Sequence, residues 1–592
     1  MDGIIYFFKT CWQYNKKYVL CLSLSQFIKI VLSIVALFFP QMILDAIFTI
    51  KQLNYTICVI SIFLVFTFLL NIVSQYILKV SNDQRTKTFN LFQVDLAKCM
   101  MSAKLEELES RNFLDLKAKA EQYIYGGGQG FASVLESSFE IFGTIVSIIL
   151  YGAVIATLHP FILLILLLTI IINVFWNSLY QKKNIKINLE KSVQERNAAY
   201  YNAVFQDFSY GKEIRSNDLR CWLLNKYNFQ LQKMQIFYKS LNKNNFLYAI
   251  ISVIISVIQQ AISYIYLVLQ TLRNGITVGT FSLYLNAILS FNNAIKAIVG
   301  QIISIRQYTL YYESYAKYRS VEDIFETNDK AATLSFQDDF VIEFHNVSFR
   351  YPNNSDYSLK NINVTIQKND RILIVGSNGA GKSTFIKLLL RIYEPTSGYI
   401  TINGIEINTI PYQHYLKLFS TVFQDYKLFA QSVRENIDFQ EENCNEDDKI
   451  MDILEYLGMA EKIRGLEKGL HTSVYKIFDE NGYTPSGGEA QKIAFARAIY
   501  KDALVFVLDE PTASLDPQAE LEIYNIFNDI VVNKTCFFIS HRLAIAAFST
   551  RILVFDNGQL IESGSHQELI DQKGKYFSMY TMQTKYYDTS FK

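Results

Sequence analysis

The chain has 592 residues, half of them apolar, and a formal net charge of +1. This length suffices for more than one domain, and the near-neutral charge gives no reason to expect a nucleic-acid partner. The seven cysteines are scattered without a CxxC pair, and no histidine stands at ligand spacing. This pattern indicates reduced thiols and no structural metal.

Six long apolar segments in the first half of the chain decide its class. Three of them, residues 56–78, 161–179 and 246–272, contain no Asp, Glu, Lys or Arg. Each is about long enough to cross roughly 30 Å of hydrocarbon at about 1.5 Å per residue. A soluble core can hold one such helix, but six in one half of a chain predict a transmembrane domain. The other three segments are residues 18–47, 141–158 and 280–305.

The charged residues between these segments predict the topology. The start of the chain, residues 1–17, and two long polar connections, residues 79–140 and 180–245, are rich in Lys and Arg, whereas the short connections are not. The positive-inside bias therefore places the N-terminus, both long connections and everything after the sixth segment in the cytosol. Residues 1–17 carry no small-residue cleavage site, so we expect an interfacial helix there, not a signal peptide.

The composition changes near residue 326. Residues 326–340 are polar, as in a linker, and short β-type runs such as "RILIVG", "LVFVLDE" and "TCFFIS" then alternate with helical patterns. This alternation is typical of an α/β domain with a largely parallel sheet. We expect an all-α transmembrane domain with six spans, residues 18–325, fused to an α/β domain, residues 341–592.

The segment "RILIVGSNGAGKST" matches a phosphate-binding loop between a strand and a helix. Backbone amides of such a loop bind phosphates, Lys382 can neutralise the β- and γ-phosphates, and the Ser383 hydroxyl can ligate Mg²⁺. The expected nucleotide-binding residues of this loop are Gly376, Ser377, Asn378, Gly379, Ala380, Gly381, Lys382, Ser383 and Thr384.

The run "LVFVLDE" supplies acidic partners for this loop, because Asp509 and Glu510 stand at the end of a predicted strand. We expect Asp509 to hold Mg²⁺ through water and Glu510 to activate the attacking water. A strand that ends in acids is common, but together with the phosphate loop it indicates nucleotide hydrolysis.

The stretch "PSGGE" begins a helical pattern and has two interpretations. Ser486 and Glu489 fit a capping box, in which each side chain accepts a hydrogen bond from the other residue's backbone amide. Gly487 and Gly488 leave the positive end of the helix open to an anion, although no lysine follows to hold a phosphate. The two interpretations are compatible with each other.

The order of "GSNGAGKST", "VFQD", "PSGGE", "LDEPTASLD" and "ISHRL" resembles the ATP-binding cassette superfamily. The six preceding segments resemble its type IV exporters, so the resemblance covers nearly the whole chain. It implies an ATPase that uses ATP and Mg²⁺, with Tyr351 stacked on adenine, Gln424 touching Mg²⁺ and Asp516 at a dimer seam. It also implies that His541 contacts the γ-phosphate. The catalytic set is then Glu510, His541, Gln424 and Lys382, and the metal ligands are Ser383, Gln424 and Asp509.

In this family the serine-glycine-glycine helix end binds the γ-phosphate of ATP held on the opposite subunit. The resemblance therefore implies a dimer, and the intact motifs favour a homodimer, with a heterodimer as the alternative. The motif departs from the common "LSGGQ" at Pro485 and Glu489. These departures bear on the catalytic rate of the site and leave its existence untouched.

The expected activity is ATP-driven export by alternating access across a bacterial cell membrane. Residues 112–116 and 207–218, in the two long connections, are candidate coupling helices that transmit the movement. The spelling "SGGEAQKIAFARAIY" is similar to bacterial peptide exporters of the lantibiotic type, which favours a peptide substrate. A lipid or multidrug exporter is the alternative.

Polar residues inside the spans are hypotheses for substrate contact. Lys29 would lie about 16 Å deep by helix rise, whereas Lys296 is closer to the cytosolic end of its span and can snorkel. Four amide side chains either line a pathway or link helices, namely Gln259, Gln260, Asn292 and Asn293.

Proteins of other classes would share parts of this pattern. An ATP-gated channel or membrane regulator would share every motif, and directional flux against a gradient would distinguish it from a pump. A soluble cassette ATPase acting on ribosomes or DNA conflicts with the six apolar segments, and the fusion of the two domains disfavours an importer.

Overall fold

The structure of the chain is a computed structural model that divides into two units. Unit 1 comprises Met1–Lys98 and Asp115–Ser320, and unit 2 comprises Cys99–Leu114 and Val321–Lys592. The described residues are 2–50, 53–125, 130–158, 160–309, 311–325, 340–352, 354–439, 446–510, 525, 534–540 and 543–589.

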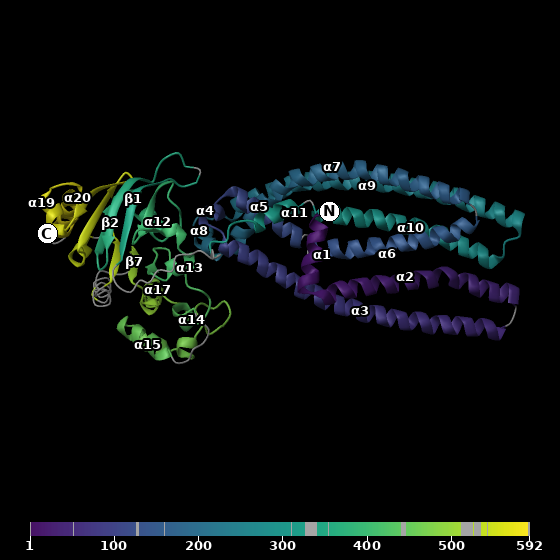
Figure 1. Cartoon of the computed structure of the whole chain (residues 1–592), viewed down its shortest axis with the longest axis horizontal. Helices are drawn as coiled ribbons and strands as arrows, with labels where there is room; N and C mark the ends of the chain where they lie inside the picture. The colour runs from purple at the N-terminus through teal and green to yellow at the C-terminus, as the bar shows by residue number, and fades with distance from the viewer. Residues whose placement is uncertain are drawn as a thin grey trace. The chain divides into compact units, whose positions relative to one another are not determined.

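Unit 1 is helical, and six of its described helices are long and apolar enough to cross a membrane. Each corresponds to one of the six apolar segments, so the prediction of six spans is confirmed. Several helices continue far into the long polar connections, and α7 and α9 run side by side (Figure 1). The six are α2 (Lys16–Asp45), α3 (Leu53–Ser102), α6 (Gly130–Leu158), α7 (Pro160–Gln206), α9 (Arg220–Asn274) and α10 (Val278–Thr309).

Shorter helices complete unit 1. The expected N-terminal helix is present as α1 (Asp2–Tyr14), and its Phe7 stacks on Tyr123 with ring centroids 4.4 Å apart. Gly275, at a φ of 65°, ends α9 in the left-handed conformation that glycine adopts readily. The remaining elements are η1 (Ala46–Ile50), α5 (Arg111–Tyr125), η3 (Phe208–Tyr210), α8 (Gly211–Ser216) and α11 (Tyr312–Arg319).

Unit 2 contains two sheets. The expected parallel sheet is confirmed, because β9, β3, β8, β7 and β6 are adjacent and parallel, with β10 antiparallel at one edge. Its strands are β3 (Arg371–Gly376), β6 (Phe419–Val422), β7 (Val505–Asp509), β8 (Thr535–Ile539), β9 (Arg551–Asp556) and β10 (Gln559–Gly564). A second, antiparallel sheet has the order β2-β1-β4-β5 and was not predicted. It consists of β1 (Val341–Phe349), β2 (Leu359–Gln367), β4 (Ser397–Ile402) and β5 (Ile405–Glu406).

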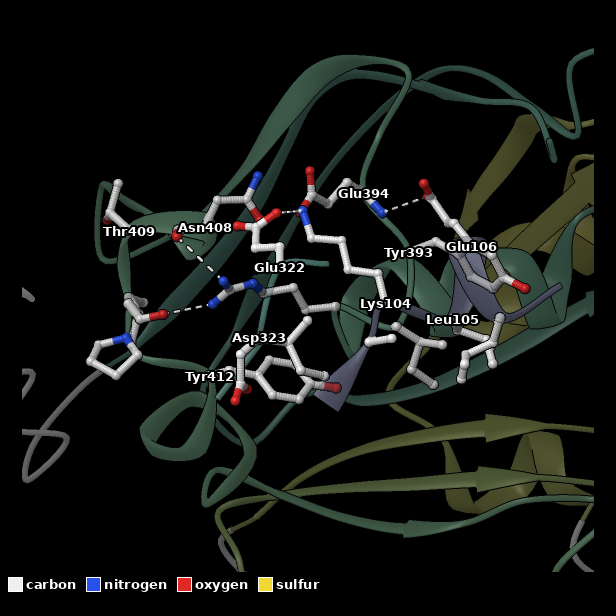
Figure 2. Close-up of a pocket in the computed structure, with 17 residues that line it drawn as sticks. Lys104, Leu105, Glu106, Glu322, Asp323, Tyr393, Glu394, Asn408, Thr409 and Tyr412 are labelled. Carbon is white, nitrogen blue, oxygen red and sulfur yellow. Dashed lines mark hydrogen bonds and ion pairs between the residues drawn. The ribbon is translucent and has the colours of Figure 1, made fainter. Parts of the chain in front are cut away.

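Helices of unit 2 pack around these sheets, and the short α4 of the first long connection belongs to the same unit. Figure 2 shows the residues around α4 next to Tyr393 and Glu394. The α-helices are α4 (Leu105–Leu108), α12 (Lys382–Leu389), α13 (Tyr412–Leu416), α14 (Val433–Ile437), α15 (Asp447–Tyr456), α16 (Ala460–Arg464), α17 (Gly487–Lys501), α19 (His566–Asp571) and α20 (Lys575–Thr589). The short 3₁₀ turns are η4 (Ile407–Thr409), η6 (Gly469–His471) and η7 (Leu543–Phe548).

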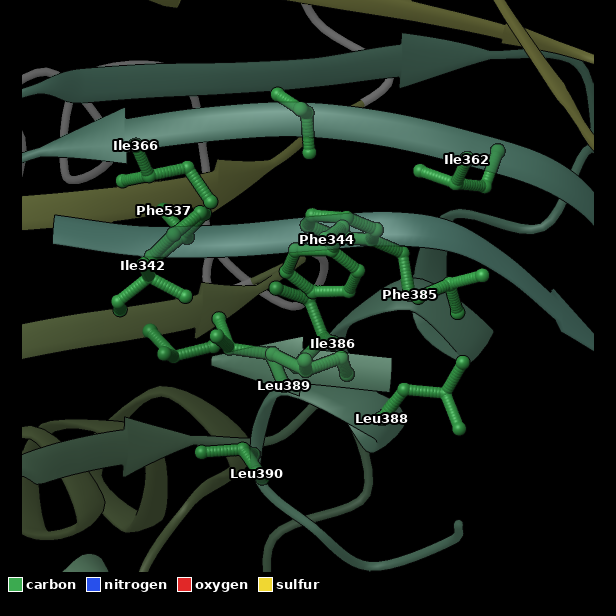
Figure 3. Packing of buried hydrophobic residues seen from close by; sticks show 14 of the residues in the cluster. Ile342, Phe344, Ile362, Ile366, Phe385, Ile386, Leu388, Leu389, Leu390 and Phe537 are labelled. Carbon is green, nitrogen blue, oxygen red and sulfur yellow. The ribbon is translucent and has the colours of Figure 1, made fainter. Parts of the chain in front are cut away.

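The parallel sheet is buried on both faces, which explains the continuous apolar runs in its sequence. Alternate side chains of β3 enter different cores: Ile372 and Ile374 pack with the antiparallel sheet and α12, whereas Leu373 and Val375 pack with α17. Figure 3 shows the first of these clusters, with Phe344 stacked on Phe385. Because β3, β8 and β7 are parallel neighbours, the loops after β3 and β7 leave the same edge of the sheet.

Candidate functional site

The phosphate loop follows β3 directly and ends where α12 begins at Lys382. Gly376, Gly379 and Gly381 have φ angles of 155°, 78° and 105°, which L side chains rarely adopt. A Cβ on Gly376 would lie 2.3 Å from the carbonyl oxygen of Phe555, so the glycine also permits close strand packing. The loop predicted from the sequence therefore has the conformation that a row of phosphate-facing amides requires.

Lys382 is the buried cation of this loop. Its side chain is 6% exposed, and its Nζ donates hydrogen bonds to the carbonyl oxygens of Gly376 (2.9 Å) and Ser377 (3.0 Å). Burial lowers the pKa of Lys382, and the charges of Glu510 and Asp509 oppose that shift. The ammonium is thus held inside the loop, close to both acidic residues at the end of β7.

Asp509 ends β7 and is the acid best suited to a divalent cation. It is 8% exposed, and its Oδ1 has no hydrogen-bond partner among the described residues. Burial and the Glu510 charge raise the pKa of Asp509 to about 6, while a hydrogen bond from Ser383 and the Lys382 charge act in the opposite direction. An unsatisfied carboxylate oxygen beside a serine hydroxyl fits Mg²⁺, which prefers oxygen ligands.

Glu510 and Gln424 are brought together by the next strand of the sheet. Glu510 follows β7 and Gln424 follows β6, and Gln424 Nε2 donates to Glu510 Oε2 at 3.0 Å. The backbone of Glu510 has a φ of 45°, and its N–H donates to Ile539 O at 3.0 Å. Two predicted site residues that are 86 positions apart in the sequence therefore touch.

Tyr351, the predicted adenine-stacking residue, is half-buried beside the helix after the phosphate loop. Its hydroxyl lies 3.1 Å from the Thr384 hydroxyl, and its ring meets the ring of Tyr393 edge-on at 5.3 Å. The structure therefore places this aromatic side chain next to the phosphate loop, as a base-stacking role requires.

The capping box in "PSGGE" is present. Ser486 is the N-cap of α17, its hydroxyl accepts from the Glu489 N–H, and Glu489 Oε2 accepts from the Ser486 N–H at 2.8 Å. The hydrogen bond from the Ser486 amide lowers the pKa of Glu489, and Lys462 lies 3.7 Å from its other oxygen. The box satisfies the amide of Glu489 and leaves the first-turn amides of Gly487 and Gly488 without an intrahelical acceptor. Both glycines lie at the exposed helix end, where an anion can reach them.

Two predicted residues, Asp516 and His541, lie outside the described residues. In the membrane segments, the Nζ of Lys29 lies 3.1 Å from a carboxylate oxygen of Glu140, a partner that was not predicted for it. Glu140 immediately precedes the uncharged segment 141–158, and its place at the start of a span was the only indication in the sequence that it could pair with a lysine in another span.

The amide residues inside the spans divide into two groups. Asn292 is buried and donates to Ser256 at 2.8 Å, so it links α10 to α9, and Gln259 is also buried. Asn293 is exposed and Gln260 is half-buried within unit 1, and Lys296 is exposed there as well.

The two candidate coupling segments, residues 207–218 and 112–116, differ in the structure they adopt and in their contacts. Residues 207–218 form η3 and α8, and Phe208 at their tip is 97% exposed. The first connection contacts the ATPase core through α4 and the residues beside it, upstream of the predicted residues 112–116. Sequence reasoning missed this contact because α4 has no distinctive motif.

Several known proteins are similar to this chain. Residues 359–513 match the family model described as ABC transporter. The subtilin transport ATP-binding protein SpaT of Bacillus subtilis is 28% identical over 94% of this chain and 91% of its own length. The nisin transport ATP-binding protein NisT of Lactococcus lactis subsp. lactis is 31% identical over 67% of this chain and 66% of its own length. The structure of a bacterial Atm1-family ABC exporter with ATP bound has a TM-score of 0.82 at 20% identity, covering 96% of this chain and 99% of that one.

Proposed function

We propose that this chain, which belongs to the ATP-binding cassette (ABC) transporters, exports a peptide as a homodimer. As a member of this family it is an ATPase coupled to transmembrane transport, a multi-pass membrane protein with a cytosolic ATPase domain. The observation that carries the ATP-hydrolysis part of the proposal is the convergence of the phosphate loop with Asp509 and Glu510 at one edge of the parallel sheet.

The loop binds the phosphates of ATP through its amides, and Lys382 neutralises their charge. Ser383, Asp509 and Gln424 would hold Mg²⁺, which supplies positive charge against the phosphate oxygens. Glu510 accepts a proton from the attacking water. Gln424 holds the Glu510 carboxylate in place through their hydrogen bond.

The adenine stacks on Tyr351, and His541 contacts the γ-phosphate. The remaining face of the ATP is covered by residues 486–489 of a second copy, in which the N–H groups of Gly487 and Gly488 have no acceptor within their own helix. Asp516 lies at the seam between the copies. Since each site takes residues from two chains, ATP binding closes the dimer and hydrolysis releases it, and alternating access follows.

The departures at Pro485 and Glu489 are compatible with this role. The Glu489 carboxylate accepts a hydrogen bond from the Ser486 N–H and forms an ion pair with Lys462. Its negative charge is therefore balanced by groups of its own chain. The interaction leaves the two glycines accessible.

A peptide substrate is favoured by how much of the chain the relatives match. SpaT, one of the lantibiotic-peptide exporters among the relatives, aligns over 94% of this chain, including the membrane segments. The beta-(1-->2)glucan export protein NdvA of Bartonella bacilliformis aligns over 49%, and the lipid A-core flippase of Chromobacterium violaceum over 53%. Because the membrane segments contact the transported molecule, a match that includes them carries more weight. Lipid export is the second candidate, supported by the flippases.

Disulfide formation between copies tests the shared site. Two differently tagged chains, one with Ser486→Cys and the other with Asn378→Cys, are co-expressed and oxidised in membranes with and without ATP. We expect ATP-dependent crosslinking of the two tags. Ser565→Cys is the matched control, because Ser565 caps α19 in the same capping-box geometry but lies outside the motif. Equal crosslinking from both cysteines, or none from Ser486→Cys, would refute the shared site.

The substrate is identified separately. Full-length Glu510→Gln protein is purified from its native membrane, and the bound molecules are identified by mass spectrometry. A co-purifying peptide supports the proposal, whereas a lipid enriched over the bulk membrane composition contradicts it.

A further inference from the structure

The first long connection is anchored to the ATPase core by ion pairs around Lys104. Its Nζ lies 2.9 Å from carboxylate oxygens of both Glu394 and Glu322 (Figure 2). The backbone N–H of Glu394 donates to Glu106 on α4 at 3.4 Å. These residues line a cavity of about 470 Å³, in which the connection meets both the core and the residues before the predicted linker.

Tyr393 forms a second attachment at the other end of α4, where Glu109 is the C-cap residue. The Tyr393 side chain is 2% exposed, and its hydroxyl donates to Glu109 Oε2 at 2.9 Å. Burial, and then Glu109, raises the pKa of Tyr393, so its phenol remains a protonated donor at neutral pH. Tyr393 therefore holds an exposed residue of the connection from inside the ATPase core.

The same tyrosine contacts the predicted adenine site. The rings of Tyr351 and Tyr393 meet at 84° with centroids 5.3 Å apart, and Lys387 Nζ lies 5.5 Å and 5.6 Å from the two centroids. The Tyr351 hydroxyl is 3.1 Å from that of Thr384. Tyr351 is thereby held at its edge by Tyr393 and at its hydroxyl by the helix after the phosphate loop.

A continuous set of contacts thus runs from the surface where a base would stack to the connection. One cavity is lined by Tyr351 together with Glu106 and Glu394, which also line the cavity around Lys104. A base stacked on Tyr351 would contact the ring that meets Tyr393 at 84°, and the Tyr393 hydroxyl continues this set of contacts to Glu109.

We propose that Tyr393 is a positioning residue that couples occupancy of the base site at Tyr351 to the order of the first cytosolic connection. This inference rests on the proposed function, because it assumes that the adenine of ATP stacks on Tyr351. Coupling between two sites is reciprocal, so an ordered connection also favours base binding.

The experiment compares variants of the full-length protein in lipid nanodiscs. Tyr393→Phe keeps the ring contact and removes the hydrogen bond, and Glu109→Ala removes the same bond from the exposed side. Tyr415→Phe is the matched control, because Tyr415 is also fully buried and its hydroxyl donates to Leu389 O at 2.6 Å within the same unit. Since Glu109 is exposed, the Ala variant tests the bond even where the core variant folds poorly.

Amide hydrogen exchange is measured with and without the Mg²⁺ complex of the non-hydrolysable analogue adenylyl imidodiphosphate. In the parent and in Tyr415→Phe we expect the nucleotide to slow exchange about tenfold in residues 99–114, within the usual range of coupling between sites. Tyr393→Phe and Glu109→Ala are expected to abolish that slowing and to retain protection of residues 376–384.

The outcomes separate the two proposals. If the nucleotide analogue does not slow amide exchange of residues 376–384 in the parent protein, the proposed ATP site itself is refuted. Normal protection there, with an unchanged nucleotide effect on residues 99–114 in both variants, would refute the coupling role alone. In a third outcome, residues 99–114 of the two variants exchange faster than in the parent by the same factor with and without nucleotide. This result would show that Tyr393 only stabilises the packing, and it also overturns the inference.

Discussion

Replacing Glu510 by Gln is expected to stop ATP hydrolysis and leave ATP bound. The side chain lies after β7 with its Oε2 at 3.0 Å from Gln424 Nε2, and an amide oxygen at that position can still accept this hydrogen bond. The backbone conformation, with φ at 45° and the N–H bonded to Ile539 O, does not depend on the charge. The substitution therefore removes a proton acceptor and little else.

The expected magnitude follows from this geometry. Loss of a positioned general base costs about 10²–10⁴-fold in rate, or about 2.7–5.5 kcal/mol in activation free energy. The companion variant Glu510→Gly should lose hydrolysis to the same extent. A non-glycine residue pays about 1 kcal/mol for the left-handed backbone conformation, and glycine does not. The Gly variant therefore regains this free energy of folding, which in part offsets the loss of the hydrogen bond to Gln424.

The assay is phosphate release by the purified full-length protein in nanodiscs, with bound nucleotide measured by rapid filtration. We expect Glu510→Gln to retain ATP with an affinity at least equal to the parent's while phosphate release falls by at least a hundredfold. Phosphate release above a tenth of the parent rate would refute the role of Glu510. Loss of ATP binding together with hydrolysis would show instead that Glu510 shapes the binding site.

Three further predictions address other parts of the molecule. Gly381→Ala is expected to weaken ATP binding more than tenfold in a filter-binding assay, because its Cβ would lie 2.6 Å from a leucine methyl group at a φ of 105°. Lys29→Glu should lower the unfolding temperature in detergent, and Lys29→Glu with Glu140→Lys should recover most of it; no recovery would show that the pair is not formed. Hydrogen bonds from Ser432 lower the pKa of Glu435, so its stabilising effect is present above the ordinary carboxylate pKa of about 4.3 and is lost as the pH falls through the lowered value. Glu435→Gln should therefore lower the unfolding temperature near pH 7, and the difference should shrink toward pH 4.

The sequence predicted those parts of the fold whose cause is local. An uncharged apolar run predicts a span because charge is expensive in hydrocarbon, and the six runs were found in six helices. The continuations of α3, α7 and α9 carry no such signal, because a polar helix exposed to water has no hydropathy pattern of its own. The antiparallel sheet was missed for a related reason: "VIEFHNVSF" predicts a strand, but not its partner or the direction of pairing.

The site residues divide in the same way. The phosphate loop and the capping box depend on fixed spacings within about ten residues, and the structure has both. Contacts such as Lys29 with Glu140, or Tyr393 with Glu109, join residues 111 and 284 positions apart. No spacing rule covers them, since the packing of whole elements decides which side chains meet.

No lysine directly follows "PSGGE", and the unsatisfied hydrogen-bonding groups of the chain indicate why this helix end needs none of its own. Lys382 satisfies carbonyl groups of its own loop, and the capping box of α17 satisfies its own cap and third residue. The amides of Gly487 and Gly488 remain at an exposed helix end with a positive partial charge. A phosphate bound to the lysine loop has oxygens that can accept further hydrogen bonds, and this helix end has N–H groups that can donate them. In the proposed homodimer two copies of one chain would satisfy both requirements at once, so ATP binding would itself favour dimerisation.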